Sequence, residues 1–160
     1  MRAILFAVLA GLASGVLAQG VGCDTPESHE LDFWLGEWDL SFVRDGKTVT
    51  SRNRVTKILD GCAVLEEFAG SPGTKLDGRS LSLYDRASKQ WRQVWVDNTG
   101  SWLDFTAARV EGDFAFVRGA THRMVFREVK PASLKWLWQA TTDGGRTWTT
   151  QWEIDYRRAK

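Results

Sequence analysis

Two polar residues stand inside apolar runs at a spacing that could support chemistry. Glu66 lies between Val64 and Phe68 at intervals of two, and Gln93 lies midway between two tryptophans. Side chains two apart share one face of a β-strand. We therefore expect Glu66 and Gln93 to face an interior with their apolar neighbours, although Glu66 beside Glu67 is also a common surface arrangement.

A carboxyl group held in an apolar interior is suited to acid–base chemistry. Glu66 and Asp97 are the candidates for a general base, and Tyr84 is the candidate proton donor. Desolvation would raise the pKa of Glu66. Asp97 directly precedes an Asn-Thr-Gly turn, so capping that turn is its competing role.

The same strands supply polar groups for holding a small molecule. Apolar walls with a few placed polar groups are typical of a ligand pocket. Ordinary packing is the competing role for the hydroxyl and indole groups, and Arg123 is a candidate partner for the Glu66 carboxylate. The candidate ligand-binding residues are Glu66, Ser82, Tyr84, Gln93, Trp95, Arg123 and Trp138.

Several other function classes find no support in the residues. The chain has no Gly-x-Ser-x-Gly elbow, no phosphate-binding glycine loop and no His-Glu-x-x-His motif. Two cysteines and two distant histidines do not make a metal site at usual spacing. The formal net charge is +1, so no basic face for nucleic acid is expected.

The N-terminus has the pattern of an export signal. Met1 and Arg2 precede an apolar segment over 3–17, which ends at a small-residue site near Ala18. We interpret residues 1–18 as a signal peptide, and the protein as periplasmic or secreted. A membrane anchor is the alternative, but about 15 apolar residues are short for a span of ~20. No second apolar segment is long enough to span a membrane in the mature chain.

The expected export bears on the state of the two cysteines. Cys23 and Cys62 are the only cysteines in the chain, and such a pair in an oxidising compartment favours a disulfide. The bridge would join an N-terminal arm to the wall of the domain. Lipid attachment at Cys23 after signal cleavage is a further alternative.

The remaining chain predicts an arm and then only strands. Residues 19–35 form the arm, with a short helix that Thr25 caps and Pro26 begins. Asp-Gly pairs at 45–46 and 60–61 are typical of hairpin turns. The strands are expected at 37–44, 48–59, 62–70, 79–84, 90–97, 102–108, 114–118, 121–130, 134–142 and 147–157.

About ten consecutive strands without a crossover helix favour an all-β fold. We predict an up-and-down antiparallel β-barrel over residues 36–158, with the short N-terminal helix as a plug, because closure removes exposed sheet edges. The run TTDGGRTW at 141–148 matches the Asp-box pattern. We interpret it as a hairpin turn held by its aspartate, because a sialidase propeller needs several copies and a longer chain.

Four runs together resemble a known family: DFWLGEW at 32–38, GCAVLE at 61–66, WRQVWVD at 91–97 and TDGGRTW at 142–148. They are similar to exported bacterial proteins of the DUF1579 type, in the calycin (lipocalin-like) superfamily. The resemblance covers residues 23–158 and implies a β-barrel with a lumen, but brings no settled activity.

The barrel also resembles the nitrobindin type, which holds haem. That family opens with a glycine-rich run containing Tyr-Pro, and residues 37–42 stand in its place here. We therefore expect no haem and no other cofactor. Three functions stay open: an exported barrel that binds a small amphipathic or aromatic molecule, a lyase, isomerase or cyclase working by acid–base chemistry in the lumen, and a structural module with a filled barrel.

Overall fold

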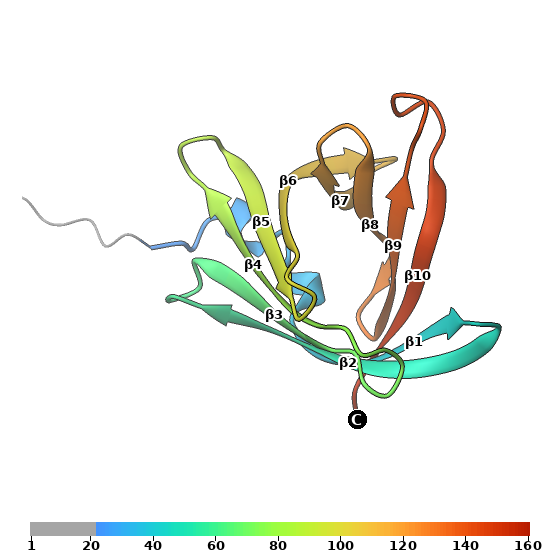
Figure 1. Cartoon of the computed structure of the whole chain (residues 1–160). Helices are drawn as coiled ribbons and strands as arrows, with labels where there is room; N and C mark the ends of the chain where they lie inside the picture. Colours follow the sequence, from blue (N-terminus) through green and yellow to red (C-terminus); the bar gives the residue numbers. More distant parts are fainter. Residues whose placement is uncertain (1–21) are drawn as a thin grey trace, which may run out of the picture.

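A computed structural model describes residues 22–160, and the proposed signal peptide lies outside this range. Ten antiparallel strands form one closed barrel in which each strand pairs with its neighbours in sequence and β1 pairs with β10. Figure 1 shows the ring of strands, with the short N-terminal helical segment in blue behind it. The up-and-down barrel predicted from the hairpin pattern is confirmed.

The strands follow the expected order with small changes in their ends. Cys62 precedes the third strand instead of beginning it, and the fourth strand begins at Asp77, earlier than expected. The strands are β1 Gly36–Arg44, β2 Lys47–Ile58, β3 Ala63–Ala69, β4 Asp77–Asp85, β5 Gln90–Asp97, β6 Trp102–Val110, β7 Asp113–Arg118, β8 His122–Lys130, β9 Ser133–Ala140 and β10 Thr149–Arg158.

The turn between β1 and β2 has the backbone geometry that makes an Asp-Gly pair predict a hairpin. Asp45 and Gly46 both have positive φ angles, 50° and 73°. This is the backbone of a type I′ turn, whose twist matches that of the flanking strands. The turn between β6 and β7 is built in the same way from Glu111 and Gly112, with φ angles of 54° and 94°.

A pair of short 3₁₀ helices closes one end of the barrel. These helices are η1 Pro26–His29, with Thr25 at its N-cap, and η2 Asp32–Trp34. Leu31 and Trp34 are fully buried, and the Trp34 ring packs edge-on against Phe126 of β8 with ring centres 5.1 Å apart. This is the short helical plug that the sequence predicts.

Trp38 and Arg158 seal the same end. The Trp38 indole donates to the carbonyl oxygen of Trp34 at 2.7 Å, and the guanidinium of Arg158 lies 3.8 Å from the centre of the Trp38 ring. Arg158 also donates to the carbonyl of Leu35. Gly36 has a φ of 120° and lies so close to Arg158 that a Cβ atom would overlap it, so glycine is required there.

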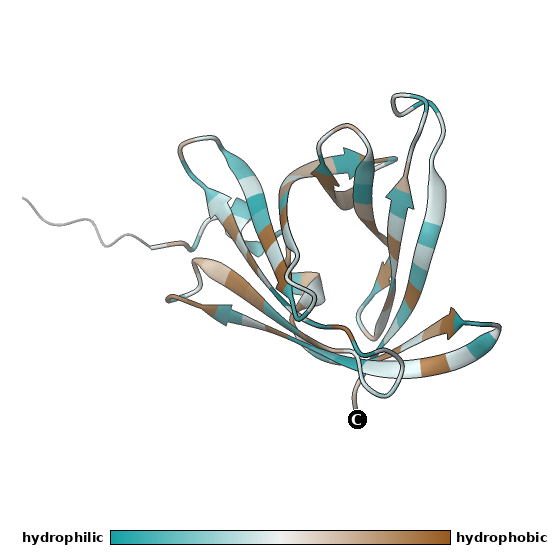
Figure 2. Ribbon diagram, in the orientation of Figure 1, coloured by the Kyte–Doolittle hydropathy of each residue, from teal (hydrophilic) through white to brown (hydrophobic). Residues whose placement is uncertain are grey.

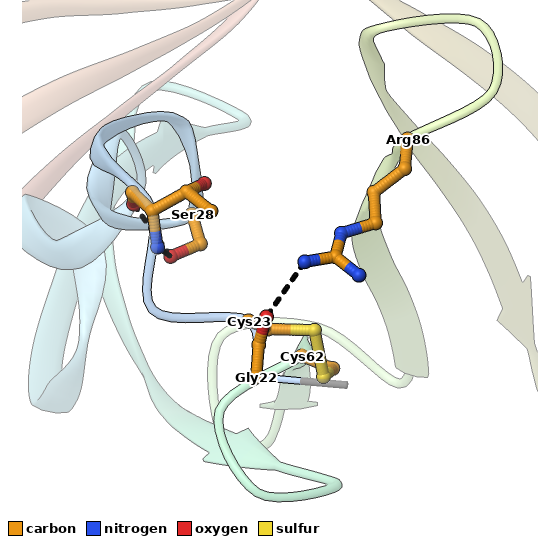
Figure 3. Close-up of a disulfide and its surroundings, with 6 residues drawn as sticks. Gly22, Cys23, Ser28, Cys62 and Arg86 are labelled. Atoms are coloured by element: carbon orange, nitrogen blue, oxygen red, sulfur yellow. Dashed lines mark hydrogen bonds between the residues drawn. A yellow bond between two sulfur atoms is a disulfide. The ribbon is translucent and has the colours of Figure 1, made fainter. Parts of the chain in front are cut away.

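A disulfide fixes the N-terminal arm to the closed end. Cys23 and Cys62 are bonded, with their Cα atoms 4.9 Å apart, and the Arg86 guanidinium donates to the Gly22 carbonyl at 2.7 Å (Figure 3). The predicted bridge is confirmed. Because the Cys23 sulfur is bonded to Cys62, the alternative of lipid attachment through that sulfur is wrong for this structure.

The Asp-box residues form a self-contained turn between β9 and β10. The Asp143 carboxylate accepts hydrogen bonds from the Thr147 backbone N–H at 3.0 Å and from the Thr147 and Thr141 hydroxyls at 2.6 and 2.7 Å. These bonds lower the pKa of Asp143 to about 2. The aspartate thus holds the turn, as the sequence interpretation states.

Hydrophilic and hydrophobic residues alternate along the strands (Figure 2), as expected when alternate side chains face the barrel interior. The buried apolar residues run from the helical plug through the barrel. Within residues 22–160, no helix has the length and apolar character needed to cross a membrane. The largest fully buried apolar side chains are Trp34, Trp38, Phe116, Phe126, Leu31, Leu40, Val55, Val64 and Val125.

Candidate functional site

The barrel contains a cavity of about 240 Å³ in the half away from the helical plug. Its deepest residues come from the middle of the strands and are buried, whereas those near the ends of β5, β9 and β10 are half-buried. The lining residues are Glu66, Phe68, Leu76, Gln93, Trp95, Asp97, Leu103, Phe105, Met124, Trp136, Trp138, Trp152, Ile154 and Tyr156.

Glu66 lies at the buried end of this cavity. Its Oε1 accepts a hydrogen bond from the Asn53 side-chain amide at 2.8 Å, and its Oε2 accepts one from the Ser80 hydroxyl at 2.7 Å. Glu66 is 7% exposed. β3 places it inward because Val64 and Phe68 share its face.

The carboxyl group of Glu66 has no cationic partner. Among the described residues, no lysine, arginine or histidine nitrogen comes within 4.0 Å of it, whereas Glu67 on the outer face pairs with Arg79. Desolvation by burial raises the pKa of Glu66 to about 7, even though hydrogen bonds from Ser80 and Asn53 and the charge of Arg79 act to lower it. Glu66 therefore exchanges a proton near neutral pH.

A buried phenol adjoins Glu66. The Asn53 amide donates to the Tyr156 oxygen at 3.2 Å as well as to Glu66, so Asn53 bridges the two groups. Burial and the nearby Glu66 raise the pKa of Tyr156 well above its ordinary value. Tyr156 thus stays protonated, and its hydroxyl faces the same cavity as Glu66.

Gln93 is fixed by a neighbour on β4. Its side-chain amide donates to the Ser82 hydroxyl at 2.9 Å, and the two residues are direct partners in the β4–β5 register. Ser82 is fully buried and does not line the cavity, so its role is to orient Gln93. Both therefore lie inward, but only Gln93 reaches the cavity.

Trp95 and Asp97 form the β5 side of the wall. The Trp95 indole donates to the Asp97 carboxylate at 2.9 Å. The ring packs so closely on Gly78 that a Cβ atom there would lie 2.0 Å from a ring carbon. Gly78 therefore makes room for the indole across the β4–β5 pair.

Hydrogen bonding makes Asp97 a poor general base. Burial raises its pKa, but hydrogen bonds from the Thr99 hydroxyl, the Trp95 indole and the backbone N–H groups of Thr99 and Ser101 outweigh burial and lower it strongly. Asp97 is thus ionised and caps the turn after β5, which was its competing role.

Three further tryptophans build the opposite side. Trp136 and Trp138 stack nearly parallel, with ring centres 6.3 Å apart, and Trp152 meets Trp136 edge-on at 5.8 Å. His122 stacks on Trp138 at 5.3 Å. The half-buried indole faces leave this wall apolar and polarisable.

Tyr84 does not share the cavity with Glu66. It lies nearer the plugged end, opposite Trp91 in the β4–β5 register, and lines a separate hollow with Glu30 and Arg109. Arg109 and Glu30 form an ion pair there at 2.7 Å. The pairing of Tyr84 with Glu66 as acid and base is therefore wrong in geometry.

Arg123 lies on the outer face of β8. Met124, its neighbour in sequence, lines the cavity, so the two side chains point to opposite faces. Arg123 donates to Gln139 at 2.7 Å and lies 4.1 Å from the centre of the Trp148 ring. The expected pairing of Arg123 with Glu66 is wrong.

Sequence reasoning missed two polar groups of the site. Asn53 reaches Glu66 across the β2–β3 pair, whereas Tyr156 comes from β10 and reaches Glu66 only when the barrel closes. The signal for Tyr156 was the alternation of Trp152, Ile154 and Tyr156 on one face of β10. Asn53 lies between Ser51 and Val55 on the buried face of β2, a weaker pattern.

Within residues 22–160, no group of three or more potential metal-ligating side chains is found. His29 is held by Asp24 and Asp32 at 2.7 and 2.6 Å, outside the barrel cavity. The sequence matches no protein-family model and no curated protein, so the cavity and its residues carry the functional argument.

Proposed function

We propose that the protein is an exported barrel that binds a small amphipathic or aromatic molecule in this cavity. The observation that carries the proposal is the wall: mostly aromatic and aliphatic side chains, interrupted by Glu66, Gln93 and Tyr156 at the buried end. Such a division between apolar walls and few convergent polar groups is typical of ligand sites.

The volume suits a molecule of about one ring with a short polar extension. A cavity of ~150 Å³ in another protein accommodates benzene, and this cavity measures about 240 Å³. A filled barrel acting only as a structural module is less well supported, because its interior would lack this space.

Tryptophan fluorescence tests the proposal directly. We expect small aromatic compounds to quench the emission of the wild-type protein saturably. Trp138→Leu removes an indole from the cavity wall and is expected to weaken binding about tenfold. Trp102→Leu is the matched control, because Trp102 is 65% exposed on the outside of β6. Equal effects of the two variants, or no saturable response in folded protein, would contradict the proposal.

An acid–base enzyme is the second candidate, favoured by one observation. Glu66 has a pKa of about 7 and faces the cavity beside the protonated Tyr156. Glu66 would be the base and Tyr156, in place of Tyr84, the donor. Glu66→Gln is then expected to abolish turnover while ligand still binds, and retained turnover would exclude this function.

The proposal places the protein outside the reducing cytosol. The Cys23–Cys62 bridge is typical of oxidising compartments, and the closed antiparallel barrel agrees with a calycin-like fold. Membership of the DUF1579 type and cleavage near Ala18 are parts of the proposal. The mass of the mature protein after expression with its own N-terminus tests the cleavage site.

A further inference from the structure

The charged groups that line the cavity all have one sign. Glu66 and Asp97 are its carboxyl groups, and no lysine, arginine or histidine is among the described lining residues. Four tryptophans share the wall with them: Trp95, Trp136, Trp138 and Trp152. Indole faces carry negative electrostatic potential and attract cations, so the walls and the carboxyl groups favour the same charge.

Glu66 retains capacity to accept further hydrogen bonds. Each carboxylate oxygen accepts one bond, from Asn53 or from Ser80, whereas a carboxylate has about four acceptor positions. A buried carboxylate without a cation is unfavourable. The Glu66 side chain is more than nine-tenths buried and borders the cavity, so a ligand there could supply the missing hydrogen bonds and charge.

We infer that the ligand is a small organic cation, an aromatic or aliphatic amine or quaternary ammonium, whose charged group lies near Glu66 and against the indoles. This inference rests on the proposed binding function and specifies its ligand class. A neutral ligand would leave Glu66 without a partner, and an anion would meet two carboxyl groups and the indole faces.

The geometry also links binding to pH. Asn53 on β2 and Ser80 on β4 donate hydrogen bonds to Glu66. Gln93 on β5 and Tyr156 on β10 line the same cavity, and Tyr156 stays protonated. The other charged groups nearby are Asp97, which is ionised, the outward-facing Arg79, and His122 against Trp138. Glu66 is therefore the cavity group whose charge changes near pH 7.

Benzyltrimethylammonium is a suitable probe because its charge does not depend on pH. We expect it to bind at least ten times more tightly at pH 8 than dimethylbenzylcarbinol, a neutral compound of similar shape, and more tightly than hydrocinnamate. Since a group of pKa near 7 is ionised to about one part in ten at pH 6, affinity for the cation should fall about tenfold from pH 8 to pH 6. Calorimetry measures the affinity for each compound and the change in affinity for the cation with pH.

Glu66→Gln and Glu67→Gln form a matched pair of variants. Both remove one carboxylate from β3, but Glu67 points away from the cavity and pairs with Arg79. We expect Glu66→Gln to lose the preference for the cation and its pH dependence, and Glu67→Gln to retain both. Near-ultraviolet circular dichroism verifies that each variant is folded. If Glu66→Gln does not fold, the comparison of the three compounds on the wild-type protein still tests the inference.

The outcomes separate this inference from the proposed function. Equal affinity for the cation and the neutral compound, or tighter binding of the anion, would overturn the cationic ligand and leave the binding barrel standing. Binding of none of the three compounds would count against both. A preference for the cation that persists at pH 6 or in folded Glu66→Gln would overturn the assignment of Glu66 as its partner.

Discussion

Replacing Glu66 by glutamine should stabilise the protein at alkaline pH and leave it nearly unchanged at acidic pH. The structure shows why: Glu66 is buried, accepts two hydrogen bonds and has no cationic partner within residues 22–160. Its ionised form is therefore penalised in the folded state and not in the unfolded chain. Glutamine has similar size and carries no charge at any pH.

The magnitude follows from the two pKa values. The pKa of Glu66 is about 7 in the folded state and ordinarily 4.5, and each pKa unit is worth about 1.4 kcal/mol. The folded state binds the extra proton between these values, so the free energy of unfolding falls as pH rises through this window. Ionisation of Glu66 thus costs about 3 kcal/mol above pH 7 and nothing below pH 4.5.

Urea unfolding of the oxidised protein from pH 4.5 to pH 8.5 measures this difference. We expect the free energy of unfolding of Glu66→Gln, relative to wild type, to rise with pH and to level off above pH 7. Glu67→Gln should show no such rise, because Glu67 is on the outer face. A difference between Glu66→Gln and wild type that stays constant across this range would refute the reasoning.

Three further outcomes test other parts of the structure. Gly78→Ala should lower the free energy of unfolding by about 1–3 kcal/mol in urea titrations and alter Trp95 fluorescence, because a Cβ atom would overlap that ring; an unchanged spectrum would contradict this packing. Cys23→Ser with Cys62→Ser should cost about 4 kcal/mol for a sequence separation of 39, and unaltered urea midpoints would exclude a stabilising bridge. Asp143→Asn should lower the melting temperature at pH 7 and have a much smaller effect at pH 2, because the pKa of Asp143 is lowered from 3.8 to about 2 and its stabilising contribution is lost as pH falls from 3.8 through 2; a deficit of the same size at pH 2 would point to packing instead of charge.

The barrel was predictable because its signals are local. Asp-Gly turns and alternating side chains mark hairpins within a few residues of one another, and consecutive hairpins leave closure as the way to remove both edges. Glu66 and Gln93 were found in the same way, since each lies between apolar residues of its own strand. The paired cysteines needed only the expectation of export.

The rest of the site depends on information that one strand does not contain. Tyr84 shares one face of β4 with the buried Ser80 and Ser82, but its position along the barrel puts it beside Trp91 and away from Glu66. Arg123 is next in sequence to Met124, whose side chain faces the cavity. Because side chains alternate with a period of two, an error of one residue in β8 moves a side chain to the opposite face of the sheet. Tyr156 meets Glu66 only through closure of the ring.

Both described ends of the chain lie at the plugged end of the barrel. The bridge at Cys23 anchors one to the start of β3, and the backbone N–H of Ala159 donates to the Glu37 carbonyl at the start of β1. The mouth opens at the opposite end, bordered by half-buried residues such as Trp95 and Trp152. A fusion tag, linker or fluorescent reporter joined next to Gly22 or after Lys160 would thus lie away from the entrance and should not obstruct the ligand binding that we propose.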